Sequence, residues 1–371
     1  MARRNRTYPG MRNSSFTDFS KSFPDSHGRR RKSYAERQKQ RKTLLISLAV
    51  CGVLLLFLAC FFVTNMLLEL SEAPPTDSAA NPSTAAPPLG TSAAPPTQTT
   101  APPAASSGFR AGYAGPSVLG GGQPLTRFLN QAKEKGWNAV LIDFKDRSGT
   151  INYPSALPVA EKTGSAAKAY PASADSVRAL QEKGLLVIAR IYCFQDPPAA
   201  REMRAAAVQY RQEGKLWLDQ AAEQGGQPWL NPYAADAVKY LCGVVTEVSA
   251  LGADYILLEA VQFARGSLTS AYFTGEKAPG ALSRNAVLGD FVSQAKQAAG
   301  PVPVLCSMAA GAAFGTPSLQ YDGDLWNCGA DGFVIPMELS QLPQLGNIPA
   351  GKHAIPLLPQ APKSGEYMLS K

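Results

Sequence analysis

Short apolar runs alternate with longer amphipathic stretches from about residue 109 to the last residue of the chain. Apolar runs of about four to eight residues bounded by glycine or by charge are typical of strands buried on both faces. The regular alternation of such strands with helical stretches predicts βαβ units and a parallel sheet. The clear runs predict strands at residues 109–114, 139–142, 185–191, 254–259, 302–306, 332–337 and 354–358.

Glycine and proline predict where the helices between these strands begin and end. One helix ends at Gly136, and a second, at residues 176–183, ends at Gly184, because glycine readily adopts the left-handed conformation that closes a helix. Asn231 and the proline after it predict the N-cap and first residue of a helix that continues to about residue 250. Residues 215–230 predict a short hairpin over one end of the sheet.

Residues 109–371 have the usual size of one eightfold β/α barrel. An eighth strand could come only from residues 366–369, with almost no room for a helix before it. We therefore predict an α/β fold, a (β/α)8-type TIM barrel that is either closed by these residues or incomplete at its C-terminal seam. Active sites of such barrels lie at the carboxyl ends of the strands.

A nearly unbroken apolar segment, residues 44–68, precedes the barrel and is long enough to cross roughly 30 Å of hydrocarbon. The basic tail before it, residues 1–43, holds 13 Lys and Arg against three acidic residues. Because cytoplasmic flanks carry the positive charge, this asymmetry predicts an uncleaved transmembrane signal anchor. The N-terminus would be cytoplasmic and the C-terminal domain extracytoplasmic, in a single-pass protein of the cell membrane. A cleaved signal peptide and a lipoprotein signal fit less well, since the apolar core is long and follows a long basic region.

Composition changes again in residues 69–108, where nine prolines stand among Ala, Ser and Thr without Lys or Arg. Such a segment predicts a disordered, extended linker. The net charge of +8 comes from the basic tail, because 23 basic and 25 acidic residues follow residue 43. The charge therefore gives no reason to expect nucleic acid as a partner.

Few residues of the outer domain suit nucleophilic or metal chemistry. Its one histidine, His353, precedes a predicted strand and so belongs to the barrel end opposite the active site. This argues against a Ser-His-Asp triad, a Cys-His dyad and a histidine metal site, and no glycine motif for a phosphate is present. We predict no metal and no cofactor. The domain has four cysteines, Cys193, Cys242, Cys306 and Cys328. We expect them to be buried free thiols, and a disulfide between two of them is the alternative.

Carboxylates, cations and aromatic residues follow the predicted strands at their carboxyl ends. Two carboxyl groups that flank a glycosidic bond, together with aromatic faces for sugar rings, are typical of a carbohydrate site. The candidate catalytic residues are Glu259 with either Asp143 or Glu338. The candidates for substrate binding are Lys145, Asp146, Arg190, Asp196, Trp217, Trp229, Asn231, Gln262 and Phe263.

Most of these side chains also have a structural interpretation. Asp143 and Lys145 alternate to the same side of a strand and could pair with each other, and Arg190 could pair with Asp196. The two tryptophans could pack on each other as a cover over the barrel. Asn231 is predicted to cap a helix in either case.

Four segments in one colinear order carry a resemblance: VLIDFKDRSG at residues 140–149, VIARIYCFQDP at 187–197, WLNPY at 229–233 and DGFVIPM at 331–337. They resemble successive motifs of a bacterial family assigned by similarity to the glycoside hydrolases with an amylase-like barrel. Its members are often tethered by an N-terminal membrane helix. The resemblance covers about residues 109–360 and implies a glycosidase-like barrel, without implying a substrate.

The sequence departs from this family after the fourth strand, where the family typically shows an Asp-Tyr-x-Arg-Phe-Pro sequence. Here residues 259–264 read EAVQFA, so the carboxylate is Glu259 and Gln262 replaces the arginine. An arginine beside a catalytic carboxylate keeps it charged, whereas an amide supplies hydrogen bonds without charge. The family's Tyr-Pro-Ser-His run is likewise replaced by ELSQ at residues 338–341.

Three functions are compatible with these residues. The first is a retaining-type glycoside hydrolase that acts on cell-envelope or other extracellular glycan. The second is a barrel that has lost turnover and binds glycan or an envelope partner, and the third is a scaffolding protein. Without the family's arginine, burial is expected to raise the pKa of Glu259, so we expect weak or no hydrolysis of generic glycans with binding retained. The separation of the two carboxyl groups, about 5 Å for retention and roughly 6.5 to 9.5 Å for inversion, is the most informative observation.

Overall fold

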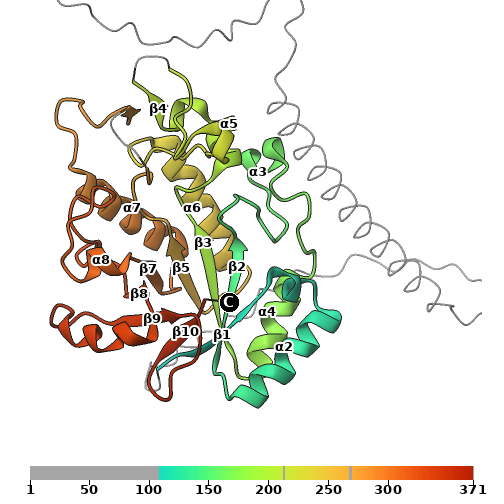
Figure 1. Ribbon diagram of the computed structural model, residues 1–371. Coiled ribbons are helices and arrows are strands. Elements are labelled where there is room, and N and C mark those ends of the chain that lie inside the picture. Colours follow the sequence, from blue (N-terminus) through green and yellow to red (C-terminus); the bar gives the residue numbers. More distant parts are fainter. Residues whose placement is uncertain (1–107, 212–213, 267–269, 371) are drawn as a thin grey trace, which may run out of the picture. The chain divides into compact units, whose positions relative to one another are not determined.

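Eight parallel strands form a closed barrel, and β1 is paired with β2 on one side and with β10 on the other (Figure 1). The computed structural model describes residues 108–211, 214–266 and 270–370. The predicted TIM barrel is confirmed, and its seam is closed. The strands are β1 Arg110–Ala114, β2 Ala139–Lys145, β3 Leu186–Tyr192, β5 Tyr255–Glu259, β7 Val304–Ser307, β8 Gly332–Pro336, β9 Ala354–Leu358 and β10 Tyr367–Leu369.

Helices lie around the outside of the ring of strands (Figure 1). The longer ones are α2 Gly122–Lys135, α4 Ser173–Glu182, α6 Ala235–Ala250 and α7 Arg284–Ala299. The shorter helices are α3 Pro158–Thr163, α5 Pro197–Glu202 and α8 Ala310–Ala313, with 3-10 turns η1 Pro116–Gly120, η2 Arg204–Ala206, η3 Ala222–Gln224 and η4 Leu339–Asn347. A separate antiparallel pair joins β4 Gln209–Tyr210 to β6 Ala271–Tyr272.

Two glycines near the first strand occupy positions where a side chain would strain the backbone or clash with a neighbour. Gly136 ends α2 in the left-handed conformation at φ 65°, as the sequence predicts, and its N–H bonds the carbonyl groups of the last helical turn. A Cβ on Gly112 would lie 2.1 Å from the ring of Trp137, which stacks on Phe128 of α2. The missing side chain at Gly112 thus leaves room for the ring of Trp137 against β1.

The eighth strand, β10, has only three residues, and the side chain just before it helps to join the seam. Glu366 Oε1 accepts a hydrogen bond from the backbone N–H of Phe109 at 3.1 Å, next to β1. Glu366 Oε2 lies 2.7 Å from Nε2 of His353, which directly precedes β9. One carboxylate therefore connects the starts of three neighbouring strands, and no helix is needed between β9 and β10.

The pair between His353 and Glu366 makes the stability of the seam depend on pH. The bond to Glu366 raises the pKa of His353 above its usual 6.5. Because the folded state then binds the proton more tightly, the stabilisation is fully present below the unfolded pKa and is lost as pH rises through the folded pKa. We expect His353→Gln to destabilise the domain relative to the native protein at about pH 5.5, and the difference to shrink at about pH 8.5, in urea unfolding. A difference that grows with pH would contradict this role.

One local prediction is confirmed in part and a second was wrong. Residues 215–230 turn back on themselves through an antiparallel bridge between Leu218 and Pro228, and the N–H of Asp219 bonds the carbonyl of Gln227, but they form no continuous strands. Asn231 does not cap α6, because the residue before that helix is Ala234. Its side chain accepts a hydrogen bond from the N–H of Tyr233 and donates one to the carbonyl of Thr274, so it shapes a turn that ends before the helix begins.

The predicted basic tail, membrane span and linker lie outside the described residues, apart from residue 108, and stay predictions. Within the described part of the chain, no helix combines the length and apolar character needed to cross a membrane. The four cysteines of the domain are free thiols, and all but the partly buried Cys242 are buried.

Alternate residues of the strands fill the interior of the barrel. Ala139 and Leu141 of β2, Ile188 of β3 and Leu257 of β5 belong to one buried cluster. The strand residues between them, such as Val140, point to the other face of the sheet and belong to a larger cluster that includes helix side chains. Since side chains alternate along a strand, the next inward positions after the first cluster lie at the carboxyl ends of the strands.

Candidate active site

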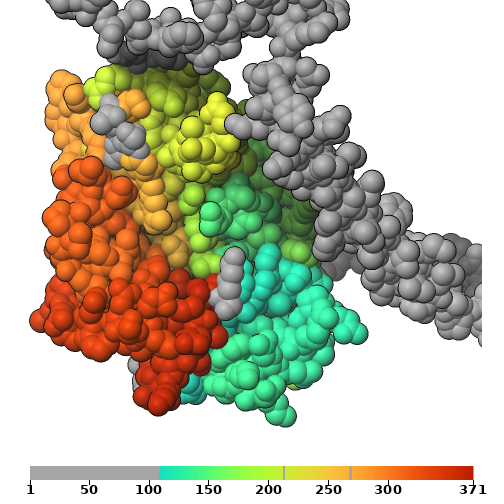
Figure 2. Space-filling view, viewed as in Figure 1, coloured from blue at the N-terminus to red at the C-terminus, as the bar shows by residue number. Residues whose placement is uncertain are grey.

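A cavity of about 800 Å³ opens at the carboxyl ends of the strands, within the size range of ligand sites. Each strand contributes inward-facing residues from its last three positions or directly after its end. These lining residues are Tyr113, Asp143, Arg190, Tyr192, Glu259, Ser307, Pro336, Leu357 and Ser370. In the space-filling view, segments from both ends of the described domain, teal and red, meet on the same face (Figure 2). The cavity is therefore the mouth of the barrel, where the sequence predicts the active site.

The strand that opens the site, β2, changes its register at its end. Asp143 pairs with Arg190 of β3, but Lys145 pairs with Ile191, because the register shifts between the two β2 residues. Asp143 keeps the inward direction, while Lys145 turns to the outer side with Ile191. The two side chains therefore do not share one side of the strand, and the alternative in which Asp143 and Lys145 pair with each other does not hold, since a bulge breaks the alternation.

Asp143 is held by a two-point ion pair with Arg190. Arg190 Nε donates to Oδ1 and the terminal nitrogen donates to Oδ2 at 3.1 Å, and the hydroxyl of Tyr113 also donates to Oδ2 at 3.0 Å. The guanidinium lies over the rings of Tyr113 and Tyr192, 5.4 and 5.5 Å from their centroids. Burial opposes its charge, but the bonds to Asp143 raise the pKa of Arg190, so the guanidinium group stays charged.

Glu259 ends β5 on the same face of the barrel as Asp143. Burial raises the pKa of its carboxyl group, while the charge of Arg190 and a hydrogen bond with Ser307 oppose that shift. The predicted direction is confirmed. A carboxyl group with a raised pKa keeps its proton to higher pH and suits a general acid. The mouth thus combines a carboxylate paired with a guanidinium group and a carboxyl group whose pKa is raised.

The residue after Glu259 has an unusual backbone conformation. Ala260 lies at φ 54°, in the left-handed region that residues with a Cβ seldom adopt, and it lines the cavity. Its carbonyl accepts a hydrogen bond from the N–H of Phe194, and the carbonyl of Glu259 accepts one from Cys193. Such local strain is frequent at functional sites, and here it turns the chain so that Glu259 and Gln262 both reach the cavity.

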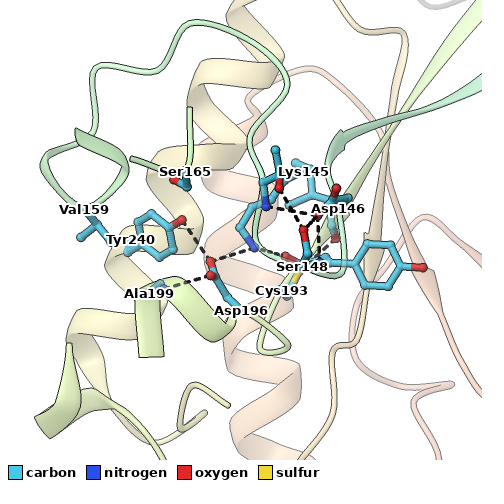
Figure 3. Close-up of polar contacts among 12 residues, drawn as sticks. Lys145, Asp146, Ser148, Val159, Ser165, Cys193, Asp196, Ala199 and Tyr240 are labelled. Atoms are coloured by element: carbon cyan, nitrogen blue, oxygen red, sulfur yellow. Dashed lines mark hydrogen bonds and ion pairs between the residues drawn. The ribbon is translucent and has the colours of Figure 1, made fainter. Parts of the chain in front are cut away.

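Lys145 and Asp196 form a fully buried ion pair behind the cavity (Figure 3). Lys145 Nζ lies 2.9 Å from Asp196 Oδ2 and donates to the carbonyl of Tyr192. Asp196 also accepts hydrogen bonds from the hydroxyl of Tyr240 and the N–H of Ala199. The alternative in which Arg190 pairs with Asp196 does not hold, because Arg190 pairs with Asp143. The buried pair therefore connects β2, β3, α5 and α6 beneath the site, and neither side chain lines the cavity.

The other candidate residues divide between the cavity and the surrounding structure. Asp146, Trp229 and Gln262 line the cavity together with Asp143, Arg190 and Glu259. Trp217, Phe263 and Asn231 are buried outside its lining, and Glu338 is exposed.

Glu338 follows a strand, but it does not line the cavity that contains Glu259. Strand β8 ends at Pro336, which takes the inward position at the mouth. Glu338 instead caps η4, where its side chain accepts from the backbone while the side chain of Gln341 bonds its N–H. Asp143 shares the cavity with Glu259, as do Asp146 and Asp219.

Several lining residues were not among the sequence candidates. Tyr113, Tyr192 and Ser307 each occupy the inward position at a strand end, so counting alternate positions along the strands could have found them. Tyr321 comes from a loop without a strand pattern. Among the residues the structure covers, no group of three or more His, Cys, Asp or Glu side chains is arranged to hold a metal ion.

The family model described as "Putative glycosyl hydrolase domain" matches residues 113–317, more than half of the chain. The protein therefore belongs to this family. The matched segment contains Asp143, Arg190, Glu259 and Gln262. A search of the curated proteins found no match.

Solved structures with similar folds have low sequence identity to this chain. A hypothetical protein from Ruminiclostridium thermocellum is 22% identical with a TM-score of 0.46, over 52% of this chain and 95% of that one. An α-L-fucosidase isoenzyme 2 from Paenibacillus thiaminolyticus is 16% identical with a TM-score of 0.45, over 68% and 40%. An α-galactosidase from Thermus thermophilus is 17% identical with a TM-score of 0.36, over 54% and 38%. The chain thus matches less than half the length of the fucosidase and of the galactosidase.

Proposed function

We propose that the barrel is a retaining-type glycoside hydrolase with an amylase-like arrangement of strands, in which Glu259 and Asp143 act on opposite sides of a glycosidic bond. The observation that carries the proposal is that one cavity at the strand ends holds both groups, with Arg190 bonded to Asp143. Their environments differ in the way that acid and nucleophile require: one carboxyl group has a raised pKa, and the other is paired with a guanidinium.

In the first step, Glu259 gives its proton to the glycosidic oxygen while Asp143 attacks the anomeric carbon. The leaving sugar departs with the proton, and a glycosyl ester with Asp143 remains. In the second step, Glu259 as a carboxylate takes a proton from water, whose oxygen attacks the anomeric carbon and releases Asp143. The partly exposed rings of Tyr113 and Tyr192 line the cavity and offer surfaces for sugar rings.

Binding without turnover is the second candidate, and the contacts of Asp143 favour it. Both oxygens of this carboxylate already accept hydrogen bonds, from Arg190 and Tyr113. Hydrogen bonds that stabilise the carboxylate reduce its tendency to attack carbon. For this reason we expect slow hydrolysis of generic glycans.

The experiment compares native protein, Glu259→Gln and Gln262→Arg on a panel of wall polysaccharides, with cleavage and affinity measured for each. The hydrolase proposal expects release of reducing ends by the native protein and its loss in Glu259→Gln. Equal binding by all three proteins without cleavage by any of them would replace it with the binding function.

We also propose that the barrel acts outside the cytoplasm on cell-envelope or extracellular glycan, held by the segment at residues 44–68. The support is the charge asymmetry around that apolar segment. Protease added to intact spheroplasts is expected to remove the barrel domain. Protection of the domain in intact cells, with digestion after lysis, would overturn this orientation.

A further inference from the structure

The side chain of Gln262 is buried at the mouth of the barrel with half of its hydrogen-bonding capacity unused. It is 2% exposed and lines the cavity. Among the described residues, its Nε2 and Ser165 Oγ are the two buried side-chain polar atoms without a hydrogen-bond partner. Leaving a buried donor unpaired costs free energy, so such an atom beside a cavity points to a ligand.

The orientation of this amide is determined by its neighbours. The hydroxyl of Tyr321 accepts a hydrogen bond from the N–H of Ala309 at 3.1 Å, so its own proton is available for Gln262 Oε1 at 3.0 Å. Burial raises the pKa of Tyr321 to about 12, which keeps that proton in place. Arg265, which can only donate, also bonds Oε1, at 3.4 Å. The oxygen of the amide therefore accepts from two groups, and the N–H groups of Nε2 remain available to a ligand.

The charges around the cavity favour an uncharged ligand atom at Nε2. Four carboxyl groups and three guanidinium groups line the cavity, so neither sign of charge dominates it. The lining acids and bases are Asp143, Asp146, Asp219 and Glu259 with Arg147, Arg190 and Arg265. A neutral amide N–H in a cavity lined by groups of both signs matches a hydroxyl oxygen, which can accept from the amide and still donate to a carboxyl oxygen.

We propose that Gln262, positioned by Tyr321, donates from Nε2 to a hydroxyl oxygen of the sugar bound next to Glu259, and so determines which sugar the site accepts. The proposal rests on the proposed function for the identity of the ligand class. Tyr321 is a positioning residue in it, because its hydroxyl touches the amide oxygen. Without that hydroxyl, only the longer bond from Arg265 would orient the amide.

The test uses methyl glycosides of glucose, galactose and mannose and their monodeoxy analogues as probes, with dissociation constants from ligand-observed NMR. We expect the native protein to bind a parent glycoside about 3- to 10-fold more tightly than the deoxy analogue that lacks the bonded hydroxyl group. This ratio of dissociation constants corresponds to the loss of one hydrogen bond between neutral groups. Gln262→Met removes the donor at similar volume and should abolish that discrimination, and Tyr321→Phe should weaken it. Tyr233→Phe is the matched control, because its hydroxyl bonds the carbonyl of Leu282 away from the cavity lining.

The outcomes separate this proposal from the hydrolase proposal. Parent glycosides that bind, with unchanged discrimination in Gln262→Met and Tyr321→Phe, would overturn the role of Gln262 and leave the hydrolase proposal standing. A variant that weakens all probes equally would show a structural role only, and would also overturn it. If none of the parent glycosides binds the native protein, the donor role fails, while polysaccharide cleavage still decides the hydrolase proposal.

Discussion

Replacing Asp196 by asparagine is expected to lower the free energy of unfolding by about 3 to 5 kcal/mol, because it leaves the charge of Lys145 buried without its partner. Both side chains are fully buried, 2.9 Å apart. Gly149 shows how closely this pair is enclosed, since a Cβ there would lie 2.5 Å from Asp196 Oδ1. Urea unfolding followed by circular dichroism measures the change.

Two further variants make this prediction specific. Asp175→Asn removes an exposed ion pair with Arg178 and should leave the unfolding midpoint unchanged. The double variant Lys145→Met with Asp196→Leu removes both charges and should be more stable than Asp196→Asn alone. If Asp196→Asn were as stable as Asp175→Asn, the pair beneath the site would have no structural role.

Replacing Glu259 by glutamine is expected to reduce kcat/KM by about 10²- to 10⁴-fold, the usual contribution of a general acid. Glu338→Gln is the matched control: its carboxylate is exposed and caps η4, so the rate should not change. Since the mechanism needs Glu259 protonated and its pKa is raised above 4.5, the native rate should fall on the alkaline side of that raised pKa. A rate that survives in Glu259→Gln would remove this residue from the mechanism.

The raised pKa of Glu259 also implies a cost in stability at neutral pH. Because the folded state holds the proton more tightly than the unfolded state, the contribution of Glu259 is fully present below the unfolded pKa of 4.5 and is lost as pH rises through the folded pKa. Glu259→Gln should therefore gain stability relative to the native protein between about pH 4 and about pH 8. A relative loss over that range would mean that the carboxylate is stabilised by the fold.

Much of the barrel could be predicted because its strands are apolar runs. The strand over residues 354–358 was predicted with the observed bounds, and β10 was found within the range that the sequence left for it. The closure of the seam was not predictable from local pattern, because it depends on Glu366 meeting Phe109 and His353 from distant parts of the chain.

The site was predicted less completely because side-chain direction depends on register. The bulge in β2 separates Asp143 from Lys145, and no composition or turn signal marks it. Glu338 and Asn231 were assigned by their distance from strand and helix ends, but local hydrogen bonds use both side chains elsewhere. The link between Gln262 and Tyr321 joins loops 59 residues apart, a contact that one sequence does not reveal.

The central claim is that a glycosidic bond lies between Glu259 and Asp143 at the mouth of the barrel. The most direct measurement is a crystal structure of Glu259→Gln with a bound oligosaccharide from the polysaccharide that the native protein cleaves or binds. We predict that the amide of residue 259 bonds the glycosidic oxygen, that Asp143 faces the anomeric carbon, and that the two side chains are separated by about 5 Å, as retention requires. An oligosaccharide bound away from these two residues, or with both of them on one side of the bond, would contradict the claim.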